Sequence, residues 1–406
     1  MEFKDLNQLD YISVQQESGG LDEIQRLFLS YISGCHVALS GPPGVGKTVL
    51  VNEFGEKVNQ KLISRVMGPK VNESLLISYP DLINSKGTSV TVTRPGLLAR
   101  ALKDDCIYFA DEIDRLTEDN QKLHNSAFDN RRSVTMRDGT VIQGKENFFG
   151  IIAYNPSEGM KSDLESALAD RFVHINFDYF PPEVQSMISL KKAGFSVKNL
   201  LPGKVSWRAI YYHRERKHLQ FFEVETVKKD LLLRDTHRNK TMEISKLNAK
   251  DIQTRLFIYL RYRNGPVLSN YTQPVAYKLE DLSLKLAEFG DELRKLSTDG
   301  VHYANRKLVS DMGGTGESID FSCIRLHIPS SRIQQAALKQ YAFLTAKIGC
   351  SPYLAQQYAV NLMIDQAAFG KYGKAKLGQG NSRDLFVAMA GTKGLLPMRK
   401  QRKLCA

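Results

Sequence analysis

The fold of this 406-residue chain is decided by the stretch Gly41-Pro42-Pro43-Gly44-Val45-Gly46-Lys47-Thr48. It matches the pattern G-x-x-x-x-G-K-[ST], in which backbone N–H groups and the N-terminus of a helix surround a phosphate chain. Residues 36–40, just before it, have the composition of a short buried strand, and residues 49–55, just after it, begin a helical pattern. This order predicts a phosphate loop in which Lys47 reaches the β- and γ-phosphates of a nucleotide and Thr48 binds Mg²⁺. The alternative is a glycine turn that a lysine follows by chance.

A second motif consists of the apolar run 106–110 and the two acids after it, Asp111 and Glu112. Such a run is typical of a buried parallel strand that delivers carboxylates at its C-terminal edge. We expect Asp111 to hold Mg²⁺, and Glu112 to orient and polarise the water that attacks the γ-phosphate. Alone, the pair would more simply begin a helix over residues 113–126, but the phosphate loop upstream favours the catalytic interpretation.

Two further polar residues lie next to strand-like segments. Asn155 follows the run 148–154, where it can hold the attacking water or contact the γ-phosphate; a turn asparagine before proline is the alternative. Arg171 precedes the strand-like run 172–177. An arginine there can enter a neighbouring subunit's site and stabilise charge on the transferred phosphoryl group, or simply pair with Asp170.

These motifs together resemble an AAA+ ATPase module of the MoxR-like group, which includes the CbbQ/NorQ and gas-vesicle N-type proteins. The resemblance covers residues 20–182 and rests on the stretches GPPGVGKT, CIYFADEIDR, IIAYNPSEG and ALADRFVHINFDYFPPE. It implies an α/β fold of the P-loop NTPase type, with a parallel five-stranded sheet, helices on both faces and a helical C-terminal lid. It also implies ATP and Mg²⁺ as ligands. The roles that follow are Walker A for Gly41, Pro42, Pro43, Gly44, Val45, Gly46, Lys47 and Thr48, Walker B for Asp111 and Glu112, sensor 1 for Asn155 and arginine finger for Arg171.

Members of this group also carry an insert in their second helix and a hairpin before sensor 1, both of which reach into the pore of a ring. The matching segments here are residues 83–92 and 133–142. The second predicts a β-hairpin independently of the resemblance, because Asp138-Gly139 separates two alternating runs. Arg131 and Arg132, just before it, are further candidates for a contact across the subunit boundary.

The sensor-2 arginine of the group, at the start of a lid helix, has two candidates here, Arg208 and Arg332. We favour Arg332 as a nucleotide-binding residue, because Ser330 or Ser331 can cap a helix that runs to about Ile348. This choice implies a large mixed α+β insertion before the sensor-2 helix. If Arg208 is the sensor instead, the lid is built differently.

The chain is long enough for several cores. We expect a nucleotide-binding module over residues 1–182, a first lid helix with a basic insertion over 183–328, and a helical lid with a basic tail over 329–406. The expected core strands are 36–40, 62–66, 106–110, 149–154 and 172–177, and the expected later helices are 183–194, 249–263 and 279–296.

Composition indicates a protein of the reducing cytoplasm. Apolar residues make up 42% of the chain, without a run near the ~18 that a membrane span needs. The N-terminus lacks the pattern of a signal peptide. The five cysteines form no C-x-x-C pair, so neither a disulfide framework nor a zinc site is indicated.

Charge is distributed unevenly along the chain, whose formal net charge is +12. Residues 1–181 carry 19 Lys and Arg against 25 Asp and Glu, residues 182–328 carry 25 against 17, and residues 329–406 carry 12 against 2. A basic C-terminal part favours an acidic partner. The candidates are the acidic module of a neighbouring subunit, a nucleic acid, or another acidic protein. The segment 211–218 combines tyrosines with basic residues, which suits single-stranded nucleic acid or a strand that packs its tyrosines inward.

The expected activity is ATP hydrolysis at the subunit boundaries of a ring, by resemblance a hexamer. The MoxR-like group implies remodelling or maturation of a protein partner, often one with a von Willebrand A domain. This chain shows no D-x-S-x-S motif, so such a partner would be a separate chain. A nucleic-acid-dependent motor that uses the basic C-terminal region is the alternative function.

Overall fold

The computed structural model of the chain describes residues 8–15, 17–85, 88–156, 164–180, 184, 205–213, 215–227, 230–237, 240–244, 247–262, 276–299, 331–367, 376–377 and 380–397. The chain divides into two compact units, residues 34–177 on the one hand and residues 1–33 with 178–406 on the other. This grouping differs from the expected module over residues 1–182, because strand β1 (Gln8–Ser13) pairs with a strand of the second unit. The further boundary at residue 329 stays a prediction.

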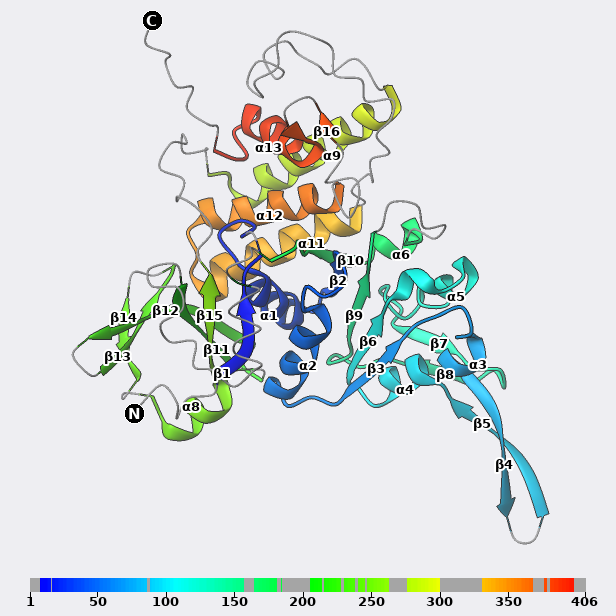
Figure 1. Ribbon diagram of the computed structural model, residues 1–406. Helices are drawn as coiled ribbons and strands as arrows, with labels where there is room; N and C mark the ends of the chain where they lie inside the picture. The colour runs from blue at the N-terminus through cyan, green and yellow to red at the C-terminus, as the bar shows by residue number, and fades with distance from the viewer. Residues whose placement is uncertain are drawn as a thin grey trace, which may run out of the picture. The chain divides into compact units, whose positions relative to one another are not determined.

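The unit over residues 34–177 is built on a five-stranded sheet, shown in Figure 1. The strand order is β10-β2-β9-β6-β3, and every neighbouring pair is parallel, which confirms the predicted parallel sheet. All five strands lie within one residue of their predicted bounds: β2 (His36–Ser40), β3 (Leu62–Val66), β6 (Ile107–Asp111), β9 (Phe149–Tyr154) and β10 (Phe172–Asn176). Both β2 and β9 are buried along their whole length, as expected of central strands covered on both faces.

Short helices connect these strands. α2 (Lys47–Lys57) contacts β6 and β9, and α4 (Leu97–Lys103) contacts β6. The single helix considered for residues 113–126 is wrong. The structure has two short segments there, the 3₁₀ turn η2 (Ile113–Arg115) and α5 (Glu118–Lys122), which the extended residues Leu116 and Thr117 separate. The remaining helices of this unit are α3 (Glu73–Leu76) and α6 (Ser166–Ala169).

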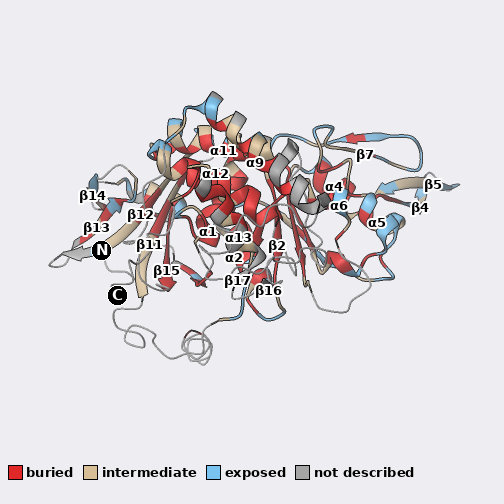
Figure 2. Cartoon of the chain, turned by 90° about the horizontal axis from the view of Figure 1, so that it is seen from above, coloured by how far each residue is buried: buried red, intermediate tan, exposed pale blue. Residues whose placement is uncertain are grey.

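Two antiparallel hairpins extend the same unit. β4 (Ser78–Ser85) and β5 (Thr88–Pro95) form a long ribbon, visible at the lower right of Figure 1. Much of this ribbon is exposed, including 73% of Leu82, as the pale blue stretches of β5 in Figure 2 indicate. The hairpin predicted over residues 133–142 is confirmed as β7 (Ser133–Thr135) and β8 (Val141–Gln143).

The second unit contains a six-stranded mixed sheet in the order β1-β15-β11-β12-β13-β14. Only the pair of β1 with β15 is parallel, and the other four pairs are antiparallel. The strands after β1 are β11 (Val205–His213), β12 (His218–Val227), β13 (Asp230–Asp235), β14 (Thr241–Glu243) and β15 (Leu256–Tyr262). The expected mixed insertion is therefore a sheet that takes one strand from the N-terminus of the chain.

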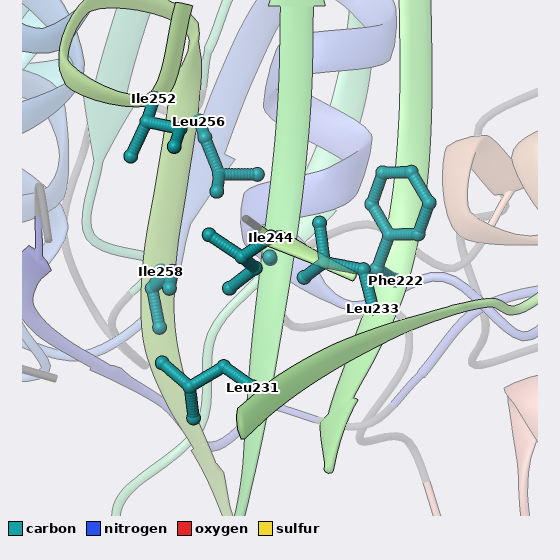
Figure 3. Packing of buried hydrophobic residues seen from close by; sticks show 8 residues of the cluster. Phe222, Leu231, Leu233, Ile244, Ile252, Leu256 and Ile258 are labelled. Carbon is teal, nitrogen blue, oxygen red and sulfur yellow. The ribbon is translucent and has the colours of Figure 1, made fainter. Parts of the chain in front are cut away.

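One face of this sheet carries an apolar cluster, shown in Figure 3, in which α8 (Ala249–Arg255) contributes Ile252. The helix expected over residues 249–263 is wrong after Arg255, where β15 begins. All seven residues of β15 are buried, and the strand is paired on both sides, by β1 and β11. A short run that is apolar throughout has no periodicity that separates a buried strand from a buried helix.

Helices complete the second unit. The helix predicted over 279–296 is confirmed as α9 (Leu279–Asp299). The helix predicted from Ser330 or Ser331 to about Ile348 is confirmed as α11 (Ser331–Phe343), which continues as the π-helical turn η4 (Leu344–Ile348), and its role as a lid stays a prediction. The first lid helix, expected over 183–194, lies outside the described residues apart from Val184, which is buried. The remaining elements are α1 (Glu23–Ser33), α12 (Pro352–Ala367), β16 (Lys376–Leu377), β17 (Gly380–Asn381) and α13 (Ser382–Thr392).

A buried ion-pair network ties the N-terminal segment to the six-stranded sheet. Arg208 on β11 binds the Asp22 carboxylate at 2.8 Å and Glu17 at 2.8 Å. Asp22 also accepts a hydrogen bond from the Tyr259 hydroxyl at 2.8 Å. Arg261 lies 3.5 Å from Glu23. The acidic residues that the sequence assigned to the nucleotide module are thus partly neutralised inside the second unit: residues 1–33 carry six acids against two basic residues.

Replacing Arg208 by alanine is expected to lower the free energy of unfolding by about 3–5 kcal/mol, because the Asp22 carboxylate, 0% exposed, would lose its cationic partner. The matched control is Arg234→Ala on β13 of the same sheet. Arg234 pairs with Glu225 at the surface, so its loss should change stability by roughly 0.5 kcal/mol or less. Urea unfolding followed by circular dichroism compares the two variants. Equal losses would show that the Arg208 network contributes no more than a surface pair.

None of the helices in the described part of the chain is long and apolar enough to cross a membrane.

Candidate nucleotide-binding site

The phosphate loop joins the end of β2 to the start of α2, as the sequence predicts. Gly44 and Gly46 have φ angles of 81° and 83°, in the left-handed region that favours glycine. Gly41 also has a positive φ, of 150°, and in addition a Cβ atom there would lie 2.5 Å from the carbonyl oxygen of Phe177. The loop is therefore held against the end of β10, and α2 begins at Lys47.

The side chain of Lys47 folds back over the loop and is 7% exposed. Its Nζ atom donates hydrogen bonds to the carbonyl oxygens of Gly41 at 2.6 Å and Pro42 at 3.0 Å, and to Asn155 Oδ1 at 2.8 Å. Burial lowers the pKa of Lys47 to about 8. The nearby carboxylates oppose this shift and raise the pKa, and that of Asp111 has the largest effect among them. Lys47 and Asn155, 108 residues apart, thus meet at the end of the parallel sheet.

The predicted metal ligands also meet. Thr48 Oγ1 donates a hydrogen bond to Asp111 Oδ2 at 2.7 Å, and the backbone N–H of Glu112 donates to Asp111 Oδ1 at 3.1 Å. A hydroxyl and a carboxylate oxygen in contact are suited to one side of a Mg²⁺ ion, whose other ligands are usually water and substrate phosphates. Within the described ranges, no group of three or more His, Cys, Asp or Glu residues could hold a metal ion.

Glu112 lies directly after β6 in a left-handed conformation, with φ 55° and ψ 42°. A non-glycine residue rarely adopts these angles, and such residues cluster at functional sites. Its carboxylate is partly exposed, and Oε2 lies 3.2 Å from Nη1 of Arg115. The structure thus places Glu112 beside Asp111, as predicted, and adds a partner that sequence reasoning missed.

A second missed residue is Asp114, which is 5% exposed. Burial raises the pKa of its carboxyl, against hydrogen bonds from the backbone N–H groups of Asp114 and Asn155 that lower it. Asp114 therefore connects the turn after β6 to the turn after β9 and fixes the position of Asn155. The sequence signal that could have identified Asp114 is its position three residues after Asp111.

Comparison with known protein families matches residues 36–172 to the AAA domain of the dynein-related subfamily. These residues form an AAA domain. The match spans residues 41–48, Asp111, Glu112, Asn155 and Arg171, and the roles of these residues in a nucleotide site stay a prediction. Membership of this ATPase family implies that the site binds ATP.

Similar proteins share this region. Protein CbbQ of Hydrogenophilus thermoluteolus is 28% identical over 175 residues, which are 43% of this chain and 64% of that protein. Protein YojN of Bacillus subtilis is 25% identical over 169 residues, 41% of this chain and 56% of that protein. A crystal structure of a candidate ATPase from Cytophaga hutchinsonii aligns with a TM-score of 0.35 and 22% identity, over 43% of this chain and 50% of that chain. The chain thus spans less than two thirds of each relative, and the AAA domain is distantly homologous to CbbQ.

Arg171 lies at the end of the AAA domain, just before β10. Its Nε atom donates to the carbonyl oxygen of Asn125 at 3.0 Å, and its Nη1 atom donates to that of Ala167. These bonds hold the guanidinium by two backbone oxygens of its own chain. Of the two further candidates for a contact across a boundary, Arg131 binds the Asp129 carboxylate through Nε and Nη2, and Arg132 has a left-handed backbone conformation with φ 46°. The role of either arginine in a neighbouring site stays a prediction.

The two sensor-2 candidates have different local structures. Arg208 lies within strand β11, where it binds Asp22 and Glu17, and not at the start of a helix. Arg332 is the second residue of α11, and its side chain lies outside the described residues. The local position of Arg332 is the one a sensor-2 residue needs, and its contact with a nucleotide stays a prediction.

The tyrosines of segment 211–218 point toward cores. Tyr212 is buried, with its ring centroid 5.9 Å from that of Phe28 and 6.0 Å from that of Tyr31. Tyr211 packs against the apolar cluster of the sheet and meets the His218 ring edge-on. These positions agree with the inward-packing interpretation and leave the segment without a stacking surface built from these tyrosines.

Binding of ATP to the AAA domain is expected to take up protons near pH 8. Burial holds the pKa of Lys47 at about 8, so roughly half of these groups are neutral at that pH. The charge of a bound triphosphate favours the ammonium form and raises this pKa, so binding at pH 8 should take up about half a proton per site and almost none at pH 6. Titration calorimetry at pH 8 in buffers of different ionisation enthalpy measures this number.

The matched control is Lys47→Arg, whose guanidinium stays protonated throughout this range. A binding enthalpy that is independent of the buffer for the unmodified protein at pH 8 would contradict the lowered pKa.

Proposed function

We propose that this chain is a Mg²⁺-dependent ATPase that works as a ring, of six copies by resemblance to its group, and uses hydrolysis to remodel or mature a protein partner. The observation that carries the proposal is the convergence of Lys47, Thr48, Asp111 and Asn155 through direct hydrogen bonds at one end of the parallel sheet. These residues come from three separate motifs, and their chemistry is that of phosphoryl transfer.

The residues of the site divide the work among them. The N–H groups of the loop and the Lys47 ammonium hold the phosphates, and Thr48 with Asp111 would hold Mg²⁺, which when bound neutralises charge that develops on the phosphates. Glu112 accepts a hydrogen bond from the attacking water and polarises it. Asn155, whose backbone N–H is held by Asp114, positions the γ-phosphate or the water.

The proposal of a ring rests on the resemblance to the MoxR-like group and on the candidate arginine finger, Arg171. Charge on the leaving phosphoryl group is commonly stabilised by an arginine, and the guanidinium groups of Arg171 and Arg131 are engaged by Asn125 and Asp129 of their own chain. We propose that Arg171 acts on the site of a neighbouring copy. The exposed ribbon of β4 and β5 offers a surface with which moving subunits can act on a client, and the client or a von Willebrand A partner would be a separate chain.

The test is ATP turnover and assembly of the purified protein with and without Mg²⁺. We expect turnover that needs Mg²⁺ and rises with protein concentration as copies associate, and no turnover for Lys47→Ala. Arg234→Ala serves as a control, because it removes a surface arginine of the other unit. A protein that stays monomeric and does not bind ATP would overturn the proposal.

The charge of the chain favours a nucleic-acid-dependent motor as the second candidate, since residues 182–406 carry 37 Lys and Arg against 19 Asp and Glu. Binding of this kind weakens steeply with salt. Strong stimulation of ATP turnover by single-stranded or duplex DNA at low salt, lost at moderate salt, would favour it over the protein-remodelling function.

A further inference from the structure

The ion pair between Arg115 and Glu112 connects a surface arginine to the residue that would activate water. Arg115 Nη1 lies 3.2 Å from Glu112 Oε2. The backbone enforces this contact, because the left-handed Glu112 precedes η2 and the N–H of Arg115 donates to the carbonyl oxygen of Glu112 at 3.0 Å. Residues three apart on a 3₁₀ turn lie above one another, so the two side chains share a face.

We propose that Arg115 restrains Glu112 in the resting AAA domain and is thus a positioning residue that sets the basal rate of hydrolysis. This inference rests on the proposed ATPase function. A general base must come within hydrogen-bond reach of the water and accept its proton. The Arg115 guanidinium occupies one oxygen of the Glu112 carboxylate and holds the carboxylate in the orientation of the pair, so that Glu112 is not free to turn toward a water.

The restraint is reversible because the pair is only partly buried. The Arg115 side chain is 52% exposed and that of Glu112 is 26% exposed, so both groups remain accessible to water and to a second copy of the chain. Pairs of this kind contribute little to stability, and a competing carboxylate can draw the arginine away.

Removal of the Arg115 side chain should leave the turn intact. Ile113 and Asp114, the other residues of η2, are buried and hold its position. The bond from the Arg115 N–H to Glu112 belongs to the backbone and survives substitution. A change in rate in Arg115 variants therefore reports on Glu112 and not on folding.

Arg115→Ala is expected to raise the basal kcat for ATP about two- to five-fold. A partly exposed ion pair contributes up to about 1 kcal/mol, so its loss can raise the fraction of unpaired Glu112 by about this factor. The KM for ATP should stay unchanged, because no phosphate contact is removed. Arg115→Lys keeps a positive charge in reach of Glu112 and should restore most of the restraint. High salt weakens the pair, so the ratio of the Arg115→Ala rate to the unmodified rate should fall toward one as salt rises.

A double-mutant comparison shows whether the effect passes through Glu112. In a Glu112→Gln background, Arg115→Ala should have no further effect, because the charge that Arg115 pairs with is gone. If the unmodified protein hydrolyses ATP and Arg115→Ala does so at an equal or lower rate, the inference about Arg115 is wrong while the proposed function stands. Absence of Mg²⁺-dependent turnover in every variant would overturn the proposed function, and this inference with it.

Discussion

Replacing Arg171 by alanine is expected to lower ATP turnover of the assembled protein by about 10³-fold or more, with ATP binding retained. An arginine finger acts on charge that develops in the transition state, and its loss costs about 10³–10⁵ in rate. In its own chain the Arg171 guanidinium donates hydrogen bonds to the backbone oxygens of Asn125 and Ala167. Steady-state turnover and ATP binding, measured on the same sample, separate the two effects.

Mixing experiments test whether Arg171 acts across a boundary. Arg171→Ala subunits keep an intact phosphate loop, and Lys47→Ala subunits keep an intact arginine, so mixed assemblies contain some complete sites. We expect the mixture to regain turnover that neither variant has alone. If both variants assemble and Arg171→Ala binds ATP, yet the mixture with Lys47→Ala stays inactive, Arg171 does not act in a neighbouring site. Arg131→Ala, mixed in the same way, tests the other candidate.

Glu112→Gln is expected to bind ATP with nearly unchanged affinity and to hydrolyse it about 10²–10⁴-fold more slowly. The amide keeps the size of the side chain but accepts no proton, so the loss is that of general-base catalysis. The Asp111 contacts with Thr48 and with the backbone N–H of residue 112 do not involve the Glu112 side chain and should persist. ATP binding by equilibrium dialysis and single-turnover hydrolysis are the measurements.

Asp138→Asn is a control for this substitution, since it removes a carboxylate from an exposed hairpin turn of the same unit. Turnover of Glu112→Gln close to that of the control would reject the role of Glu112. Slow hydrolysis with lost binding would instead indicate that Glu112 supports the nucleotide site as a whole.

The parallel sheet was predictable because its signals are local. Each strand is a short apolar run, and three of them end in a residue whose chemistry is visible in the sequence: the phosphate loop after β2, Asp111 at the end of β6 and Asn155 after β9. Parallel strands bring their carboxyl ends to one edge of a sheet. The meeting of Lys47 with Asn155 and of Thr48 with Asp111 therefore followed once the order of motifs was known.

The second unit was much less predictable, because its contacts join distant segments. Nothing in residues 8–13 indicates that they pair with β15, about 250 positions later, and the helix expected through residue 263 is wrong at the same strand. The pairing of Asp22 with Arg208 likewise depends on which strands become neighbours. Charge counts along the chain indicated the presence of acids near the N-terminus, but not that arginines of the same unit neutralise them.

By itself, the sequence determined the five parallel strands and the order of the motifs that follow them, because glycine torsions, apolar strands and the placement of carboxylates are properties of short segments. Only the tertiary structure decided three contacts: the hydrogen bond of Asp114 with the backbone of Asn155, the ion pair of Arg115 with Glu112, and the pairing of the N-terminal strand with the mixed sheet. These contacts depend on the angles of one turn and on pairing across most of the chain, and neither is encoded in local composition.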